Sequence, residues 1–230
     1  MKIDLYADGS NLTEIKRLNE DETIKGFTTN PTLMRKAGVK DYIQFVKDVV
    51  GVVKDSPVSF EVFSDDLSEM EEQGRKIAEY GDNIYIKIPI TNTKGISTAP
   101  VIKSLLNDGI KVNVTAVFTR KQIKDLLPVM NTMTPVVLSI FAGRIADTGV
   151  DPKPLVAWAV DVVSPNVEVL WASPREIYNL YEAESVGCHI ITMTPSLIAK
   201  TSLCGKSLDE YSLDTVKMFY NDASEAEYTL

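Results

Sequence analysis

The stretch at residues 84–90, IYIKIPI, decides the fold of this chain. Every second residue is an isoleucine, and Tyr85 and Lys87 stand between them. Because successive side chains of a β-strand point to opposite faces, the isoleucine row is predicted to pack under helices and Lys87 to lie on the other face. In a closed barrel that other face is the interior, so Lys87 would point inward.

Runs of the same kind continue in both directions from this strand, and amphipathic stretches such as 67–80 and 98–108 separate them. The alternation predicts an α/β fold with a parallel sheet covered by helices. Eight repeats favour a closed (β/α)8 TIM barrel, and a flavodoxin-like open sheet is the alternative. The predicted strands are 2–8, 26–30, 58–63, 84–90, 112–118, 135–143, 168–173 and 188–194.

The length of the chain fits one barrel followed by a tail. With 230 residues, 44% of them hydrophobic, it can bury the core of a single domain of this size. We expect residues 1–206 to form the catalytic barrel and residues 207–230 a helical tail. That tail has an apolar face suited either to packing on its own barrel or to contact with another subunit.

The composition excludes several classes of partner. A formal net charge of -8 argues against nucleic acid and against an anionic membrane surface. Cys188 and Cys204 form no ligand-spaced pair, and the single histidine, His189, cannot build a zinc site or most Ser-His-Asp triads. These counts predict a protein without a metal, and no cofactor is expected. No apolar run is long enough to span a membrane, so we expect a cytoplasmic protein.

Polar side chains occupy the inward parity of several strands near their carboxyl ends, where barrel active sites are built. In 112–118, Val112, Val114, Ala116 and Phe118 are predicted to face the helices and Asn113 and Thr115 the interior. The candidate site around Lys87 consists of Asp8, Asn30, Glu61, Asn113, Thr115, Ser139, Phe141 and Ser173.

Each charged residue of this set has a functional and a structural interpretation. Burial among apolar walls would favour the neutral, nucleophilic amine of Lys87, whereas a lysine at a strand end can also extend to solvent. Asp8 and Glu61 would transfer protons or simply act as its counter-ions. Arg144 and Arg175, directly after two strands, would bind a substrate phosphate or form surface ion pairs.

Five ordered motifs give the chain a family resemblance: GFTTNPTLM at 26–34, IKIPI at 86–90, NVTAVF at 113–118, SIFAGRIADTG at 139–149 and ASPRE at 172–176. Together they resemble the short form of the transaldolase and fructose-6-phosphate aldolase family. The resemblance implies a Schiff-base enzyme of the pentose phosphate pathway. It would move a dihydroxyacetone unit from sedoheptulose 7-phosphate or fructose 6-phosphate to an aldose phosphate.

The resemblance also implies residue roles. Lys87 would form the Schiff base, Asp8 would act as acid and base, and Glu61 and Thr115 would position a proton-shuttling water. Asn30, Asn113, Ser139 and Ser173 would hold substrate hydroxyls and the lysine, and Arg144 and Arg175 the phosphate. Pro174 departs from the family pattern, in which a phenylalanine commonly stands there, and puts the reach of Arg175 in question.

Within the family, transaldolases resemble this chain in having Glu and Phe at the positions of Glu61 and Phe141. Fructose-6-phosphate aldolases carry Gln and Tyr at these positions. An aldolase releasing dihydroxyacetone, a deoxyribose-phosphate type of aldolase and a catalytically silent phosphosugar-binding barrel are the alternatives. Short family members use the tail to embrace neighbours, so the resemblance implies a ring-shaped homo-oligomer.

Overall fold

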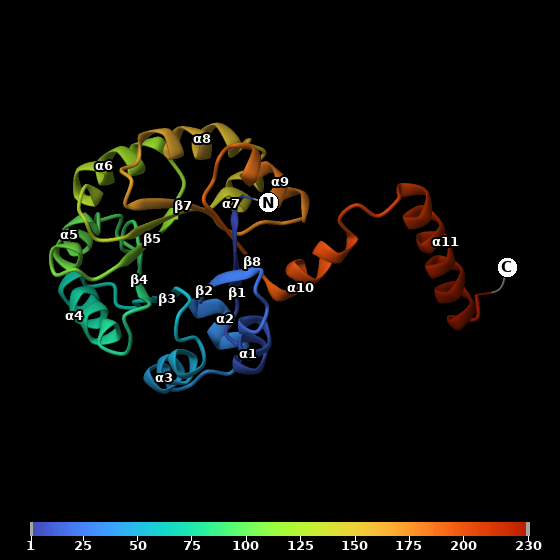
Figure 1. The fold of residues 1–230 in the computed structure, drawn as a ribbon, viewed down its shortest axis with the longest axis horizontal. Helices are drawn as coiled ribbons and strands as arrows, with labels where there is room; N and C mark the ends of the chain where they lie inside the picture. Colours follow the sequence, from blue (N-terminus) through green and yellow to red (C-terminus); the bar gives the residue numbers. More distant parts are fainter. Residues whose placement is uncertain (1, 229–230) are drawn as a thin grey trace. The chain divides into compact units, whose positions relative to one another are not determined.

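The computed structural model describes residues 2–228 and forms a closed barrel of eight parallel strands in chain order (Figure 1). This confirms the predicted (β/α)8 fold and excludes the open sheet, because β8 pairs with both β7 and β1. The strands are β1 (Asp4–Asp8), β2 (Ile24–Thr28), β3 (Val58–Glu61), β4 (Ile84–Pro89), β5 (Val112–Val117), β6 (Val136–Ile140), β7 (Val167–Trp171) and β8 (Ile190–Met193).

Helices follow the strands and cover the outside of the barrel (Figure 1). None of the helices among residues 2–228 is long and apolar enough to cross a membrane. In the unit that contains the barrel they are α1 (Leu12–Asn19), α2 (Pro31–Lys36), α3 (Tyr42–Val52), α4 (Leu67–Ala78), α5 (Ala99–Asn107), α6 (Arg120–Met130), α7 (Ala142–Ala146), α8 (Lys153–Val162), α9 (Tyr178–Ser185) and α10 (Pro195–Ile198). A further helix, α11 (Leu208–Glu225), belongs to a separate unit.

The chain divides into two compact units, one ending at Ile198 and one beginning at Ala199. The second unit holds a 3-10 turn at Ala199–Leu203 and α11, in which no residue is buried. Residues 1, 229 and 230, at the ends of the two expected domains, lie outside the described residues.

Two separate apolar clusters form the core. The larger one lies between strands and helices and includes Ile84, Ile86 and Ile88 of β4. The smaller one fills the barrel and consists of Tyr6, Tyr85, Val137, Leu170, Ala172 and Ile190, with Phe141 packed against it. The alternation in IYIKIPI therefore assigned the two faces of β4 correctly.

The predicted row of outward residues in β5 is wrong at Phe118, although Ala116 does pack against the outer core. Ala116 has φ 58°, in the left-handed region, and the register of β5 with β6 shifts between Val114 and Val117. Such a bulge turns the following side chains by one position. As a result Val117 is fully buried in the outer core, and Phe118 is 36% exposed.

Most strands end earlier than the sequence suggests, and for β2 and β6 the difference changes the place of a candidate site residue. β2 ends at Thr28, and the Asn30 side chain accepts a hydrogen bond from Leu33 N, so Asn30 caps α2 with Pro31 at its first position. β6 ends at Ile140, and Phe141 directly precedes α7. Both changes place these residues in loops at the carboxyl end of the barrel.

Candidate active site

A cavity of about 430 Å³ opens at the carboxyl ends of the strands. Asp8, Thr28 and Glu61, each the last residue of its strand, line it. The cavity is also lined by most of the residues that the sequence singled out, namely Asn30, Lys87, Thr115, Ser139, Phe141, Arg144 and Ser173. This position is the usual one for barrel active sites.

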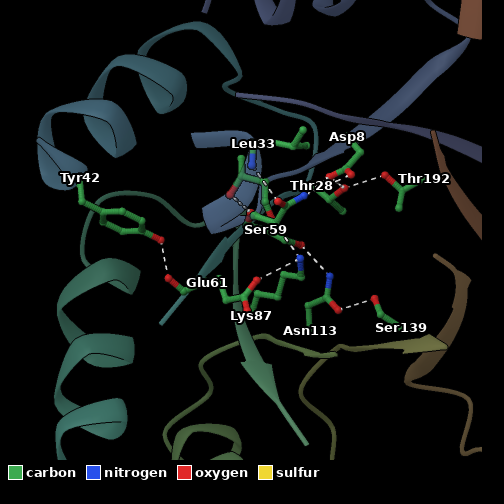
Figure 2. A network of polar contacts seen from close by, with 12 residues as sticks. Asp8, Thr28, Leu33, Tyr42, Ser59, Glu61, Lys87, Asn113, Ser139 and Thr192 are labelled. Atoms are coloured by element: carbon green, nitrogen blue, oxygen red, sulfur yellow. Dashed lines mark hydrogen bonds and ion pairs between the residues drawn. The ribbon is translucent and has the colours of Figure 1, made fainter. Parts of the chain in front are cut away.

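Lys87 on β4 lies at the centre of the polar network in Figure 2 and is only 7% exposed. Its Nζ donates to the carbonyl oxygen of Thr29 over 2.9 Å and lies 3.2 Å from Oε2 of Glu61, its register partner on β3. The expected apolar walls are therefore only part of its surroundings. Because an unpaired buried charge is costly, the carboxylate and carbonyl explain how the ammonium is tolerated.

A tyrosine on a helix outside the barrel hydrogen-bonds to the backbone of Glu61 at the end of β3. Tyr42 Oη at the start of α3 donates to the carbonyl oxygen of Glu61 over 2.6 Å (Figure 2), and its ring packs edge-on against Phe63. Burial, and then the charge of Glu61, raise the pKa of Tyr42, so it stays a neutral donor. This contact anchors the end of β3 beside Lys87.

Asp8 at the end of β1 faces the same cavity. Its Oδ1 accepts a hydrogen bond from Thr28 Oγ1 at 2.9 Å (Figure 2). Asn30 Nδ2 lies 3.3 Å from its Oδ2. Burial raises the pKa of Asp8 above its ordinary value, although Lys87 and the two hydrogen bonds oppose that shift. A carboxyl group of this kind can exchange protons closer to neutral pH than an exposed one.

A buried chain of hydrogen bonds supports the site from below. Asn113 Nδ2 donates to Ser59 Oγ at 3.0 Å, and Ser139 Oγ donates to Asn113 Oδ1 at 2.7 Å (Figure 2). Ser139 lines the cavity, whereas Asn113 lies behind it and is fully buried. Asn113 thereby fixes two serines rather than reaching the cavity itself.

The Thr115 hydroxyl differs from these neighbours because it is buried and has no hydrogen-bond partner in the described structure. Thr115 lines the cavity and immediately precedes the bulge at Ala116. Since buried hydroxyl groups are normally satisfied, Thr115 Oγ1 is available to a molecule in the cavity.

The two arginines occupy different places. Arg144 of α7 lines the cavity, and its guanidinium carbon lies 5.7 Å from the centre of the Phe141 ring. Arg175 instead pairs with Asp147 and is not among the residues that line the cavity. Only Arg144 thus meets the cavity directly, and Arg175 takes the ion-pair alternative in this structure.

Thr28, Thr192 and Tyr42 contribute to the site but were not among the predicted residues. Thr28 and Thr192 point inward from β2 and β8, and both line the cavity. Strand parity was the signal that could have identified them, since Thr28 alternates with Gly26 and Asn30. Tyr42 acts from a helix, and the sequence carries no comparable signal for it.

Comparison with known sequences points in one direction. The family described as transaldolase/fructose-6-phosphate aldolase matches residues 5–230. A "Probable transaldolase" of Brucella anthropi is 33% identical over 218 residues, which cover 92% of this chain and 96% of that protein. A "Probable transaldolase" of Nitrosopumilus maritimus is 35% identical over 202 residues, covering 85% and 86% of the two chains.

Comparison with solved structures finds barrels of distant sequence. Dihydrodipicolinate synthase from Bacillus clausii superposes with a TM-score of 0.63 at 12% identity, covering 96% of this chain and 78% of that one. At this identity the likeness supports the fold alone.

Proposed function

The chain belongs to the transaldolase/fructose-6-phosphate aldolase family, and from this membership we propose that it is a transaldolase acting through an imine on Lys87. The observation that carries the proposal is a buried lysine at the cavity floor, with Glu61 Oε2 at 3.2 Å and Asp8 in the same cavity. The donor would be fructose 6-phosphate or sedoheptulose 7-phosphate and the acceptor an aldose phosphate of the pentose phosphate pathway.

The first stage forms the imine. The Lys87 amine attacks the C2 carbonyl carbon of the ketose, and loss of water leaves a cationic imine. Glu61 is close enough to accept the proton that the ammonium must lose before attack. Thr115 Oγ1, which has no partner in the described structure, would hold with Glu61 a water that carries protons to and from C2.

The second stage breaks the C3–C4 bond, and the imine receives the electron pair as an enamine. Asp8 takes the proton of the C4 hydroxyl while the aldose phosphate leaves. The enamine then adds to the carbonyl of a second aldose phosphate, and Asp8 returns the proton. Water hydrolyses the new imine, which releases the ketose phosphate product and the free amine of Lys87. Asn30 beside Asp8, together with Ser139 and Ser173 on the cavity wall, would hold the substrate hydroxyls.

The phosphate would bind at Arg144, the arginine that lines the cavity. A fructose-6-phosphate aldolase, which releases free dihydroxyacetone, is the alternative within the family. Phe141 favours transfer because it presents a ring without a hydroxyl to the cavity, so the enamine meets fewer proton donors. The cytoplasmic location and the homo-oligomer expected from the sequence stay predictions.

The test is reductive trapping. Incubation with fructose 6-phosphate and borohydride should attach a three-carbon adduct to the peptide that contains Lys87, because only an imine is reduced in this way. Lys87→Ala and Lys87→Arg should fold normally, show no adduct and lose turnover. An unmodified Lys87 in the native protein would contradict the mechanism and favour a silent phosphosugar-binding barrel.

A parallel assay separates the two family activities. Fructose 6-phosphate is supplied with and without erythrose 4-phosphate, and the products are quantified. A transaldolase gives sedoheptulose 7-phosphate with the acceptor and little free dihydroxyacetone without it.

A further inference from the structure

Two threonines meet across the inner face of β1, just beside Asp8. Thr28 Oγ1 on β2 lies 2.6 Å from Thr192 Oγ1 on β8 and 2.9 Å from Asp8 Oδ1 (Figure 2). Thr28 is 2% and Thr192 6% exposed, so solvent competes little for either hydroxyl. The three oxygen atoms form a chain from β8 through β2 to the carboxyl group at the end of β1.

The direction of this chain follows from counting protons. A threonine hydroxyl carries one proton, and an ionised carboxylate can only accept. The proton of Thr28 is therefore committed to Asp8 Oδ1, and the short contact with Thr192 requires Thr192 to donate to Thr28. Donation into Thr28 polarises its own O–H group and strengthens its bond to Asp8.

The two oxygens of Asp8 are consequently unequal. Oδ1 receives two hydrogen bonds, from Thr28 Oγ1 at 2.9 Å and from Asn30 Nδ2 at 3.4 Å. Within residues 2–228, Oδ2 receives a single hydrogen bond, from Asn30 Nδ2 at 3.3 Å. Oδ2 thus keeps the greater capacity to accept a proton.

We propose that Thr192 is a positioning residue which fixes the direction of this hydroxyl chain and so assigns proton transfer to Oδ2 of Asp8. The proposal rests on the transaldolase function proposed above. When the C3–C4 bond breaks, the C4 hydroxyl proton passes to Oδ2, the C3–C4 electron pair enters the imine, and the C4 oxygen becomes the aldehyde carbonyl. On addition to the acceptor the proton returns from Oδ2.

The charged groups around Asp8 influence its pKa, but they do not orient the hydroxyl groups of Thr28 and Thr192. Lys87 from β4 faces Asp8 across the cavity and lowers its pKa, Glu61 from β3 is paired with Lys87, and Arg144 of α7 lines the same cavity. Burial has the largest effect and raises the pKa of Asp8. Loss of the Thr192 hydroxyl should add to that rise, because the Thr28 bond to the carboxylate weakens.

The experiment compares Thr192→Val, which removes the hydroxyl with little change of shape, with Thr192→Ser, which keeps it. Thr134→Val is the matched control, since its hydroxyl donates to the Leu106 carbonyl just before β6, at the opposite end of the barrel. Carbon-13 NMR follows the titration of Asp8 in each variant, with Asp8→Asn to assign the signal. This readout does not depend on any catalytic activity.

In Thr192→Val we expect the midpoint of the Asp8 titration to move to higher pH. In a plot of kcat against pH, the fall of kcat on the acidic side should move to higher pH as well. The kcat should fall roughly 2- to 10-fold with an unchanged KM, the effect of one neutral hydrogen bond. Thr192→Ser should restore both, and Thr134→Val should alter neither.

An unchanged Asp8 titration in a folded Thr192→Val protein would overturn the proposal, and so would a raised KM, which would mean that Thr192 touches substrate. If the native protein forms no borohydride adduct while the Asp8 titration still moves, the proposed function fails and the hydroxyl chain stands. The proton assignment to Oδ2 then falls with that function.

Discussion

Arg175 donates from Nε to Oδ1 of Asp147 over 3.1 Å, and its Nη2 pairs with the second oxygen of the same carboxylate. The pair joins the loop after β7 to the end of α7, beside rather than inside the cavity. The hydrogen bond from Arg175 holds the pKa of Asp147 below its ordinary value, so the carboxylate remains charged and competes for the guanidinium. Among residues 2–228 no ion pair joins Arg144 to Asp8 or Glu61, and Arg144 lines the cavity directly.

Arg144→Ala should therefore weaken recognition of the substrate phosphate. We expect the KM for fructose 6-phosphate to rise by the equivalent of ~1.5–3 kcal/mol, typical of a hydrogen bond to a charged group, while the KM for unphosphorylated fructose changes little. Arg175→Ala is the matched control and should have a smaller effect because Asp147 already holds that side chain. Equal losses for both sugars in Arg144→Ala would instead indicate a structural role.

The buried carboxyl of Asp8 should make the stability of the fold depend on pH. Its folded-state pKa is raised from an ordinary 3.8, so the folded state favours the protonated form and ionisation at higher pH is destabilising. Asp8→Asn should raise the melting temperature, by an amount that is absent below pH 3.8 and grows as the pH rises through the folded-state pKa. Thermal unfolding of both proteins from below pH 3.8 up to pH 8 measures the difference.

The same variant should lose activity, by ~10²- to 10⁴-fold in kcat if Asp8 transfers protons. A melting temperature that falls at every pH would show that Asp8 stabilises the fold and that the attraction between its charge and that of Lys87 outweighs the cost of burial.

Gly143 should tolerate no side chain. A Cβ atom there would lie 1.6 Å from the carbonyl oxygen of Ser173, whose φ of 59° is already in the left-handed region. Gly143→Ala must displace the loop that carries Ser173, and we expect a loss of ~1–3 kcal/mol in the free energy of unfolding together with reduced activity. Gly51→Ala is the control, because nothing lies within 4 Å of its added Cβ in α3 and a gain of up to ~1 kcal/mol is expected. Chemical denaturation of both variants gives the comparison.

Most of the correct predictions came from the alternation of apolar and polar residues along each strand. It identified the inner faces of β4 and β6, and with them the positions of Lys87 and Ser139, since one buried face fixes the orientation of every second side chain. The eight-fold alternation likewise favoured the closed barrel over an open sheet, and the structure confirms it. These features depend only on the local pattern along the chain.

Features that depend on pairing between distant segments could not be predicted in the same way. The contact of Thr28 with Thr192 needs barrel closure, and the choice of Asp147 by Arg175 depends on how two loops approach each other. The bulge at Ala116 is a third case, because alanine carries no signal for a left-handed conformation. It appears beside Thr115, where strain commonly accompanies a functional position.

Phe141 offers the sharpest test of transfer against simple cleavage. Its ring lines the cavity, packs against the inner core and lies 5.6 Å from the Phe118 ring, so it presents a face without a hydroxyl near Lys87. A tyrosine there would hold a water or donate a proton near the enamine carbon, which would discharge the three-carbon unit as dihydroxyacetone. Phe141→Tyr should therefore raise the release of dihydroxyacetone from fructose 6-phosphate relative to transfer onto erythrose 4-phosphate.

Phe118→Tyr is the matched control for this change. Phe118 is 36% exposed and is not among the residues lining the cavity, so its added hydroxyl can point to solvent and the ratio of release to transfer should stay the same. A native protein that already releases dihydroxyacetone as fast as it transfers it would refute the transaldolase assignment. The fructose-6-phosphate aldolase activity would then replace it, because the dry face of Phe141 would have failed to protect the enamine from protonation.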